Sequence, residues 1–214
     1  MRHSQISTAS KSGNAINNSV NKNLRIEFNE ARHEYRVEGV VWPSVTQVLD
    51  SMGLFPQYPA AQRDFYLARG AAIHLATGHY DNNCLGRYDD RLHGFIDAWK
   101  NFRRDSGFTP TLVEYRVASP AFQYVGTTDR VGLLDGQVTI IDLKAGEPPV
   151  CAALQTAAYR KAYFETDGVL AERRLAVRLS SDAKYSATEY RDHTGDERYW
   201  LYSLSLYRWK QENL

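Results

Sequence analysis

The 214-residue sequence has few cysteines, no long apolar run and almost no net charge, and each shortage excludes a class of protein. Only Cys84 and Cys151 are present, which is too few for a disulfide framework or a four-cysteine iron-sulfur cluster. No apolar run approaches the ~20 residues of a transmembrane helix, and the N-terminus lacks the apolar core of a secretion signal. We therefore expect a soluble, cytoplasmic protein. The net charge of +1 excludes a bulk polyelectrolyte attraction to nucleic acid, so any DNA contact must come from local basic patches.

Composition divides the chain into two parts. Residues 1–23 are rich in Ser and Asn, contain no acidic residue and show no periodic apolar positions, so we expect a flexible polar tail. The tail has too few arginines and no apolar face for an organelle transit peptide. Residues 24–214 are long enough for one well-packed domain, and we expect a single domain there.

Hydrophobic periodicity predicts an α/β sandwich (α+β), with a central mixed sheet flanked by helices. Ser44 and Gln47 have the spacing of a capping box, which marks a helix start, and Gly53 lies near the expected end of that helix. The other predicted elements are a hairpin over Leu24–Val41, helices over Ala60–Thr77 and Asp89–Arg104, a strand over Leu112–Ala118, a hairpin over Phe122–Lys144, a helix over Val150–Glu165, a strand over Arg174–Ser180 and a helix over Tyr199–Trp209.

The hairpin contains the most informative residues. A two-residue Asp135-Gly136 turn would pair Leu134 with Gln137 and place Asp129 opposite Asp142. The same register puts Thr127 opposite Lys144, and strand alternation puts Asp142 and Lys144 on one face. Two carboxylates with Cβ atoms roughly 5 Å apart repel each other unless a cation lies between them. The sequence therefore predicts a divalent metal site with a lysine beside it.

Five sequence elements, in order, carry a family resemblance. They are Trp42-Pro-Ser-Val-Thr46, Arg69-Gly-Ala-Ala-Ile-His74, Gly126-Thr-Thr-Asp129, Ile140-Ile-Asp142-Leu-Lys144-Ala-Gly146 and Gln155-Thr-Ala-Ala-Tyr159. Together they resemble the PD-(D/E)xK nuclease superfamily, and specifically its RecB-like exonuclease branch. That branch includes the RecB nuclease domain and the mitochondrial genome maintenance exonuclease. Asp-x-Lys alone is a weak motif, whereas five elements at suitable spacing form a strong one.

The resemblance implies a metal-dependent DNA nuclease that hydrolyses phosphodiester bonds, and it favours an exonuclease of recombination, repair or phage DNA metabolism. Asp129, Asp142 and the backbone carbonyl of Leu143 would hold one or two Mg²⁺ or Mn²⁺ ions, with His74 finishing the site. Lys144 would position the attacking water and offset charge on the phosphate. The expected setting is the cytoplasm of a bacterial or phage-infected cell. Two cysteines exclude the four-cysteine iron-sulfur cluster of several RecB-like nucleases.

Two of the expected site residues also have ordinary interpretations. A lone histidine on an alanine-rich helix is often structural, but Gly70 lies one turn before His74 and removes a side chain from the same face. Glu114 is either a simple exposed strand residue or a third carboxylate of the catalytic centre. The family pattern has an acid on the strand before Gly-x-x-Asp, which keeps the second interpretation open.

Gln155 and Tyr159 are four residues apart and project from one face of a predicted helix. They are either an incidental polar pair or, as the resemblance implies, DNA-binding residues above the active site. The basic candidates for contact with the DNA backbone are Arg160, Lys161, Arg173, Arg174 and Arg178, although such charges are often simply solvated.

Two alternative functions remain open at this point. One is a structure-specific or restriction-type endonuclease that uses the same site. The other is a catalytically silent nuclease-like module that binds DNA or a replication or recombination protein. The sequence leaves the oligomeric state open.

Overall fold

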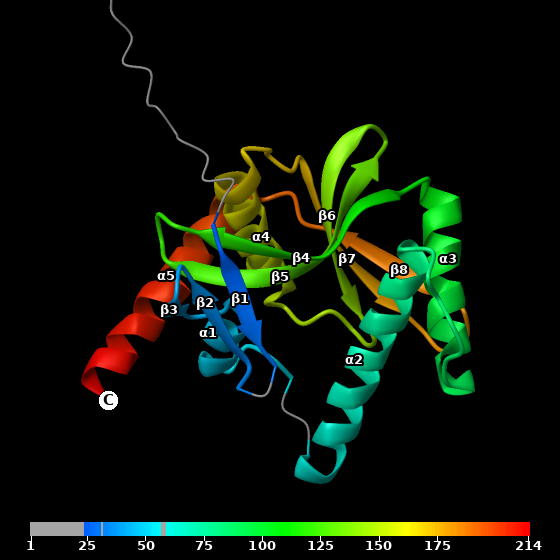
Figure 1. The fold of residues 1–214 in the computed structure, drawn as a ribbon, viewed down its shortest axis with the longest axis horizontal. Helices are drawn as coiled ribbons and strands as arrows, with labels where there is room; N and C mark the ends of the chain where they lie inside the picture. Colours follow the sequence, from blue (N-terminus) through cyan, green and yellow to red (C-terminus); the bar gives the residue numbers. More distant parts are fainter. Residues whose placement is uncertain (1–23, 31, 57–58) are drawn as a thin grey trace, which may run out of the picture.

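The computed structural model describes residues 24–30, 32–56 and 59–214 (Figure 1). The predicted tail over residues 1–23 lies outside this part of the chain. The predicted fold class is confirmed: a central five-stranded mixed sheet is flanked by helices. In the described part of the chain, no helix has the length and apolar character needed to cross a membrane.

The elements follow one another in the predicted order, with two strands that were not predicted. They are β1 (Ile26–Asn29), β2 (Glu34–Val37), β3 (Val40–Trp42), α1 (Val45–Ser51), α2 (Ala60–Asp81), the short 3₁₀ helix η1 (Asp90–Leu92), α3 (His93–Ser106), β4 (Thr109–Ser119), β5 (Tyr124–Leu134), β6 (Gln137–Lys144), α4 (Ala152–Asp167), β7 (Arg173–Leu179), β8 (Tyr185–Glu189) and α5 (His193–Asn213).

The large sheet has the strand order β4-β5-β6-β7-β8. Antiparallel pairs join β4 to β5, β5 to β6, and β7 to β8, whereas β6 and β7 are parallel neighbours connected through α4. A parallel pair needs such a crossover because its connection must return to the starting edge. The site described below lies at the C-terminal end of β6, where this crossover begins.

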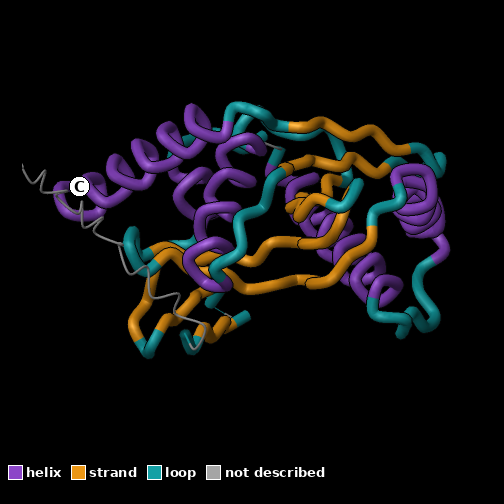
Figure 2. Tube along the Cα trace, turned by 90° about the horizontal axis from the view of Figure 1, so that it is seen from above, coloured by secondary structure: helices purple, strands orange, loops and turns teal. Residues whose placement is uncertain are grey.

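Each face of the large sheet packs against its own set of helices, which gives three layers (Figures 1 and 2). Along β6, Ile140 faces a core shared with α1, α4 and α5, while Ile141 faces a second core shared with α2 and α3. The second core contains Phe95, Trp99 and Phe102 of α3, whose helical spacing puts them on one face of that helix.

The leading segment is a three-stranded antiparallel sheet, β1-β2-β3, so the predicted hairpin over Leu24–Val41 has one more strand than expected. Its register brings Tyr35 opposite Trp42. The predicted capping box at the start of α1 is confirmed, because Ser44 accepts from the Gln47 backbone N–H and the Gln47 side chain accepts from Ser44 N. This cap fixes the direction in which the chain leaves the small sheet.

The structure differs from the prediction by one strand of the large sheet and by the ends of several elements. The polar strand β8 was not predicted, because its residues alternate weakly and it forms an exposed edge. The helix predicted over Tyr199–Trp209 begins at His193, where the Asp192 side chain caps it by accepting from Gly195 N. The predicted helix over Ala60–Thr77 likewise extends to Asp81.

Candidate functional site

The predicted hairpin register holds along most of β5 and β6 and then stops. Leu134 pairs with Gln137, as the two-residue turn requires, and the antiparallel pairing continues to Arg130 and Ile141. One residue later, the Asp129 carboxylate accepts the Leu143 backbone N–H through Oδ2 at 2.6 Å. A side chain thus replaces a backbone bond between strands at this position.

Two expectations about this register are therefore corrected. Asp129 and Asp142 are not partners in the ladder, and Thr127 is not opposite Lys144. On the β4 side, Thr127 pairs with Arg116, and its hydroxyl lies 2.9 Å from that of Tyr35. The reason is visible in Figure 1, where β4 and β5 leave the sheet together toward β1–β3 while β6 continues beside β7.

The parting of β5 from β6 lets a helix side chain approach Asp129. His74 of α2 places Nδ1 at 3.2 Å from Asp129 Oδ1 and at 3.8 Å from Glu114 Oε1. The donor atoms of these three residues all lie within 4.8 Å of one another. The structure therefore brings together His74, Asp129 and Glu114 as one group able to hold a metal ion.

Glu114 has an unusual backbone conformation within its strand. Its φ is +48°, in the left-handed region that side-chain-bearing residues seldom adopt, although Val113 and Tyr115 on either side both pair with β5. Such strain is found at functional sites because it directs a side chain that a regular strand would point elsewhere. The sequence pattern around Glu114 contains no signal for this kink.

Asp142 and Lys144 form the second half of the site. They share one face of β6, as predicted, and the Lys144 Nζ lies 2.7 Å from Asp142 Oδ2. Lys144 also donates to Gln155 Oε1 at 3.0 Å, and Gln155 Nε2 donates to the Tyr159 hydroxyl at 3.1 Å. Gln155 and Tyr159, on one face of α4, therefore hold the Lys144 ammonium in place through a chain of two hydrogen bonds.

Burial and neighbouring charge shift the pKa of each ionisable group here. Burial raises the pKa of Asp142 to about 6, with the nearby Asp129 charge adding to the rise and Lys144 opposing it. Burial acts to lower the pKa of Lys144, but the carboxylates of Asp142 and Asp129 outweigh it and raise that pKa. Lys144 is therefore an ammonium group, suited to stabilising negative charge rather than to accepting a proton.

His74 and Asp129 stabilise each other's charged form. Burial acts to lower the pKa of His74, but the Asp129 and Glu114 carboxylates raise it to about 10. Burial acts to raise the pKa of Asp129, yet His74, Lys144 and the Leu143 N–H lower it. The metal-free site thus holds a proton on an imidazole that a metal ion would need in its neutral form.

The donor set fits a hard divalent cation. Carboxylate oxygens are the ligands that Mg²⁺ and Mn²⁺ prefer, and Mn²⁺ also accepts an imidazole nitrogen. Within the described residues, Asp142 Oδ2 is buried without a hydrogen bond of good geometry, although the Lys144 ammonium lies close to it. Buried acids with incomplete partners are what a bound cation would complete. The Leu143 carbonyl as a further ligand stays a prediction.

Arg130 is a site residue that the sequence interpretation missed. It is fully buried on β5 and donates to the Glu114 carboxylate at 3.1 Å and to the Asp129 backbone carbonyl at 2.6 Å. The same guanidinium is paired with Asp81 and donates to Thr77, both at the end of α2. It therefore connects β4, β5 and α2, the three elements that carry the metal-binding group. The sequence signal that could have identified Arg130 is its position directly after Asp129 in a largely apolar strand.

Two of the residues predicted to contact DNA, Arg174 and Tyr159, are buried. Arg174 is completely buried and is held by Asp196, His193 and the Ala153 carbonyl, which contradicts the predicted contact with DNA. Tyr159 is 3% exposed and belongs to the core on the α4 side, so its ring cannot stack on a base. Its hydroxyl instead holds Gln155.

The remaining basic candidates are partly buried and already have partners. Arg160 donates to the Ala171 carbonyl at 2.7 Å and lines a cavity of about 550 Å³ between α4 and α5. Lys161 pairs with Glu197, Arg173 with Asp135 and Glu189, and Arg178 with Glu147. For these four residues, contact with DNA stays a prediction.

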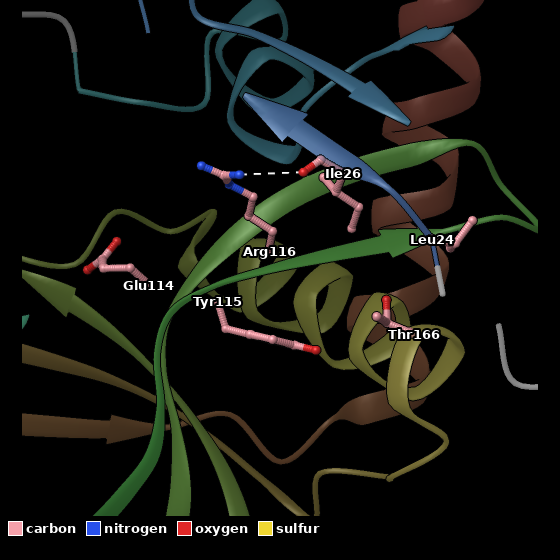
Figure 3. A pocket seen from close by; sticks show the side chains of 6 residues that line it. All are labelled: Leu24, Ile26, Glu114, Tyr115, Arg116 and Thr166. Carbon is pink, nitrogen blue, oxygen red and sulfur yellow. Dashed lines mark hydrogen bonds between the residues drawn. The ribbon is translucent and has the colours of Figure 1, made fainter. Parts of the chain in front are cut away.

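A groove adjoins the site on the side of Glu114. This cavity of about 390 Å³ is lined by Leu24, Ile26, Glu114, Tyr115, Arg116 and Thr166. Figure 3 shows Glu114 apart from the other five side chains and Arg116 reaching toward β1, where its Nη1 donates to the Ile26 carbonyl at 3.4 Å. Arg116 is an exposed cation close to the site, and it was not among the residues predicted to contact DNA.

Comparisons with known proteins give structural neighbours only. No protein-family model matches the chain, and a search of curated proteins finds no match. A candidate exonuclease from Eubacterium rectale is 8% identical, with a TM-score of 0.48 and coverage of 75% of this chain and 69% of that one. LHK-Exo in complex with dAMP is 14% identical, with a TM-score of 0.39 and coverage of 80% of this chain and 88% of that one. Likeness at this level assigns neither family nor activity, so the RecB-like resemblance stays a prediction.

The left-handed backbone at Glu114 predicts that a glycine at this position gives a more stable protein than an alanine does. Glu114→Gly and Glu114→Ala remove the same carboxylate, but only glycine adopts a φ of +48° without steric cost. We expect the glycine variant to be more stable than the alanine variant by about 1 kcal/mol in urea unfolding. Equal stabilities, or a more stable alanine variant, would show that this backbone is not strained.

The burial of Tyr159 predicts a large loss of stability on truncation. Tyr159→Ala should lower the free energy of unfolding by about 3–5 kcal/mol, because it empties a core position. Tyr159→Phe, which removes only the hydrogen bond from Gln155, should cost about 1 kcal/mol. Urea unfolding of both variants measures this difference. A Tyr159→Ala protein as stable as wild type would show that the ring is not part of the core.

The pairing of His74 with Asp129 predicts a titration far from that of a free histidine. In chelator, the His74 imidazole should remain protonated well above its ordinary pKa of 6.5, as followed by NMR of its ring protons. The stability that this pair provides is complete below pH 6.5 and is lost as pH rises toward about 10. Asp129→Asn should lower the pKa of His74, because it removes the Asp129 charge that raises this pKa against the effect of burial. An unchanged titration in that variant would mean that the two side chains do not interact.

Proposed function

We propose that this chain is a metal-dependent DNA nuclease that hydrolyses phosphodiester bonds. The observation that carries the proposal is the His74, Glu114 and Asp129 group, whose donor atoms lie within 4.8 Å of one another, beside the Asp142–Lys144 pair at 2.7 Å. A structural protein gains little from crowding two buried acids, the exposed acid Glu114 and a lysine where two strands part. Nuclease chemistry uses all of these groups.

The metal ion would be held by Asp129, with His74 and Glu114 beside it and Asp142 on the adjacent strand. When bound, Mg²⁺ or Mn²⁺ would supply Lewis-acid polarisation of the phosphate and lower the pKa of a water molecule. Arg130 holds the Glu114 carboxylate and the Asp129 backbone in place from the buried side. The site is thereby preorganised by groups that do not themselves reach the substrate.

Lys144 would act directly on the reacting phosphate. Its ammonium is fixed between the Asp142 carboxylate and the Gln155 amide oxygen, so it would not need to reorganise as charge develops. It would orient the attacking water and stabilise negative charge on the phosphate oxygens. Tyr159 keeps Gln155 in position through its hydroxyl, which makes both residues positioning groups rather than DNA-stacking ones.

The groove beside Glu114 would receive part of the substrate strand. Among the described residues that line this groove, Arg116 is the one exposed cation, and its guanidinium could contact a phosphate. Leu24 and Ile26 offer apolar surface to a sugar or base. The small net charge of the chain agrees with contact through such a local feature rather than through a broad basic face.

The resemblance in the sequence favours an exonuclease that works in recombination, repair or phage DNA metabolism. The first alternative is an endonuclease that uses the same residues, which would cut closed circular DNA. The second is a silent DNA-binding module, which loses support because both acids, the lysine and the histidine are all present and grouped.

The proposal predicts metal-dependent release of nucleotides from linear DNA. Purified protein should degrade linear single- or double-stranded DNA with Mg²⁺ or Mn²⁺, spare closed circles and be inactive in chelator. Asp142→Asn should abolish cleavage, and Lys144→Ala should lower turnover by ~100-fold or more while DNA affinity stays nearly intact. Gel and mass analysis of the products measures both.

The chain supplies a matched control for this experiment. Asp182 and Lys184 repeat the Asp-x-Lys spacing as an ion pair at an exposed turn. Asp182→Asn and Lys184→Ala should leave activity unchanged. DNA binding without cleavage in either metal would favour the silent module, and cutting of closed circles would favour an endonuclease. Full activity in Lys144→Ala would remove the proposed catalytic centre.

A further inference from the structure

The outer side of α5 carries a stripe of large exposed side chains. Tyr199, Tyr202, Leu206 and Trp209, here called the outer stripe, are 54%, 61%, 49% and 55% exposed. Trp200 and Leu204 point to the opposite side of the helix and are buried against the rest of the fold. Figures 1 and 2 show α5 at the edge of the molecule, with the other described elements on one side of it. A helix that is apolar on two opposite sides is expected to be covered on both.

The spacing of the outer stripe is that of a coiled-coil seam. Its members are separated by three, four and three residues, which matches alternating a and d positions of a heptad. The stripe is also symmetric about Leu204. In an antiparallel pair of these helices, Tyr199 would therefore lie opposite Trp209 of the second copy, and Tyr202 opposite Leu206 of the second copy.

We infer that α5 pairs with α5 of a second copy of this chain, in antiparallel orientation, to form a symmetric dimer. A two-fold interface must be complementary to itself, and a seam that is symmetric about its centre meets that requirement. This inference does not depend on the metal site or on the proposed nuclease activity.

Charges beside the seam agree with the antiparallel arrangement. With a two-fold axis near Leu204, Arg198 comes next to Glu212 of the second copy, so opposite charges meet twice in the dimer. Both residues are exposed, and the Arg198 guanidinium already lies over the Tyr199 ring at 5.3 Å. Ser203 and Ser205 flank the centre, where small side chains let the two helices approach. Parallel pairing would not bring Arg198 and Glu212 together.

The surface available is enough for a weak dimer. Large aromatic side chains bury about 150–250 Å² each, and here roughly half is already covered, so the two stripes would bury roughly 800 Å² in total. That is below the ~1,200 Å² of a standard stable interface. We therefore expect a concentration-dependent dimer with a dissociation constant on the order of 10 µM.

Sedimentation of the full chain over a concentration series tests the inference. Wild type should move from monomer to dimer, and Leu206→Glu should weaken dimerisation by at least about 10-fold, because it puts two carboxylates into the seam. Leu170→Glu is the matched control, since Leu170 is also 49% exposed but lies outside α5, and it should dimerise like wild type. A wild-type protein that stays monomeric well above 10 µM, or a dimer that Leu206→Glu leaves intact, would overturn the inference.

A charge exchange tests the orientation of the two helices. Arg198→Glu and Glu212→Arg should each weaken the dimer, and the double variant should restore it. A single cysteine at the centre is a second measurement: Ser205→Cys, with Cys84→Ser to remove the exposed native thiol, should form a disulfide-linked dimer on mild oxidation. A double variant as weak as the single ones, or no cross-link at position 205, would overturn antiparallel pairing.

Discussion

The parting of β5 from β6 is the constraint on which the rest of the site depends. Pairing between the two strands stops after Arg130 and Ile141, and the Asp129 carboxylate then takes the Leu143 N–H that a backbone carbonyl would otherwise accept. A buried N–H left without a partner is costly, so the substitution keeps the split stable. It also turns Asp129 into a fixed group at the gap, where His74 reaches it from α2.

The split leaves several charges inside the protein, and the surrounding elements hold each one. Arg130 is fully buried and spans Glu114, Asp81 and Thr77, so the guanidinium compensates for acids on two separate elements. On the opposite side, Lys144 compensates for Asp142 and is held by Gln155. Removing one member of such a network is expected to leave an unpaired buried charge. The arrangement therefore specifies a geometry, which is what a metal site requires of its scaffold.

The sequence predicted those features that depend on local rules. The Asp135-Gly136 turn fixed the hairpin register, the Ser44 capping box fixed the start of α1, and strand alternation placed Asp142 and Lys144 on one face. The features it missed depend on distant partners. The left-handed Glu114 and the buried Arg130 arise from the way β4, β5 and α2 pack, which no short pattern encodes. A helical spacing shared by Gln155 and Tyr159 was read correctly as one face, but spacing alone does not tell whether that face is covered.

The most direct test is to locate the metal ion. Crystals soaked in MnCl₂ and measured at the manganese absorption edge would give an anomalous peak at any bound ion. The account predicts one strong peak within about 2.0–2.4 Å of ligand atoms from Asp129 and at least one of His74, Glu114 and Asp142, with Lys144 nearby. It also predicts that this peak is lost in Asp129→Asn. A fully occupied peak elsewhere, or none at this site under conditions where the protein cleaves DNA, would contradict the central claim.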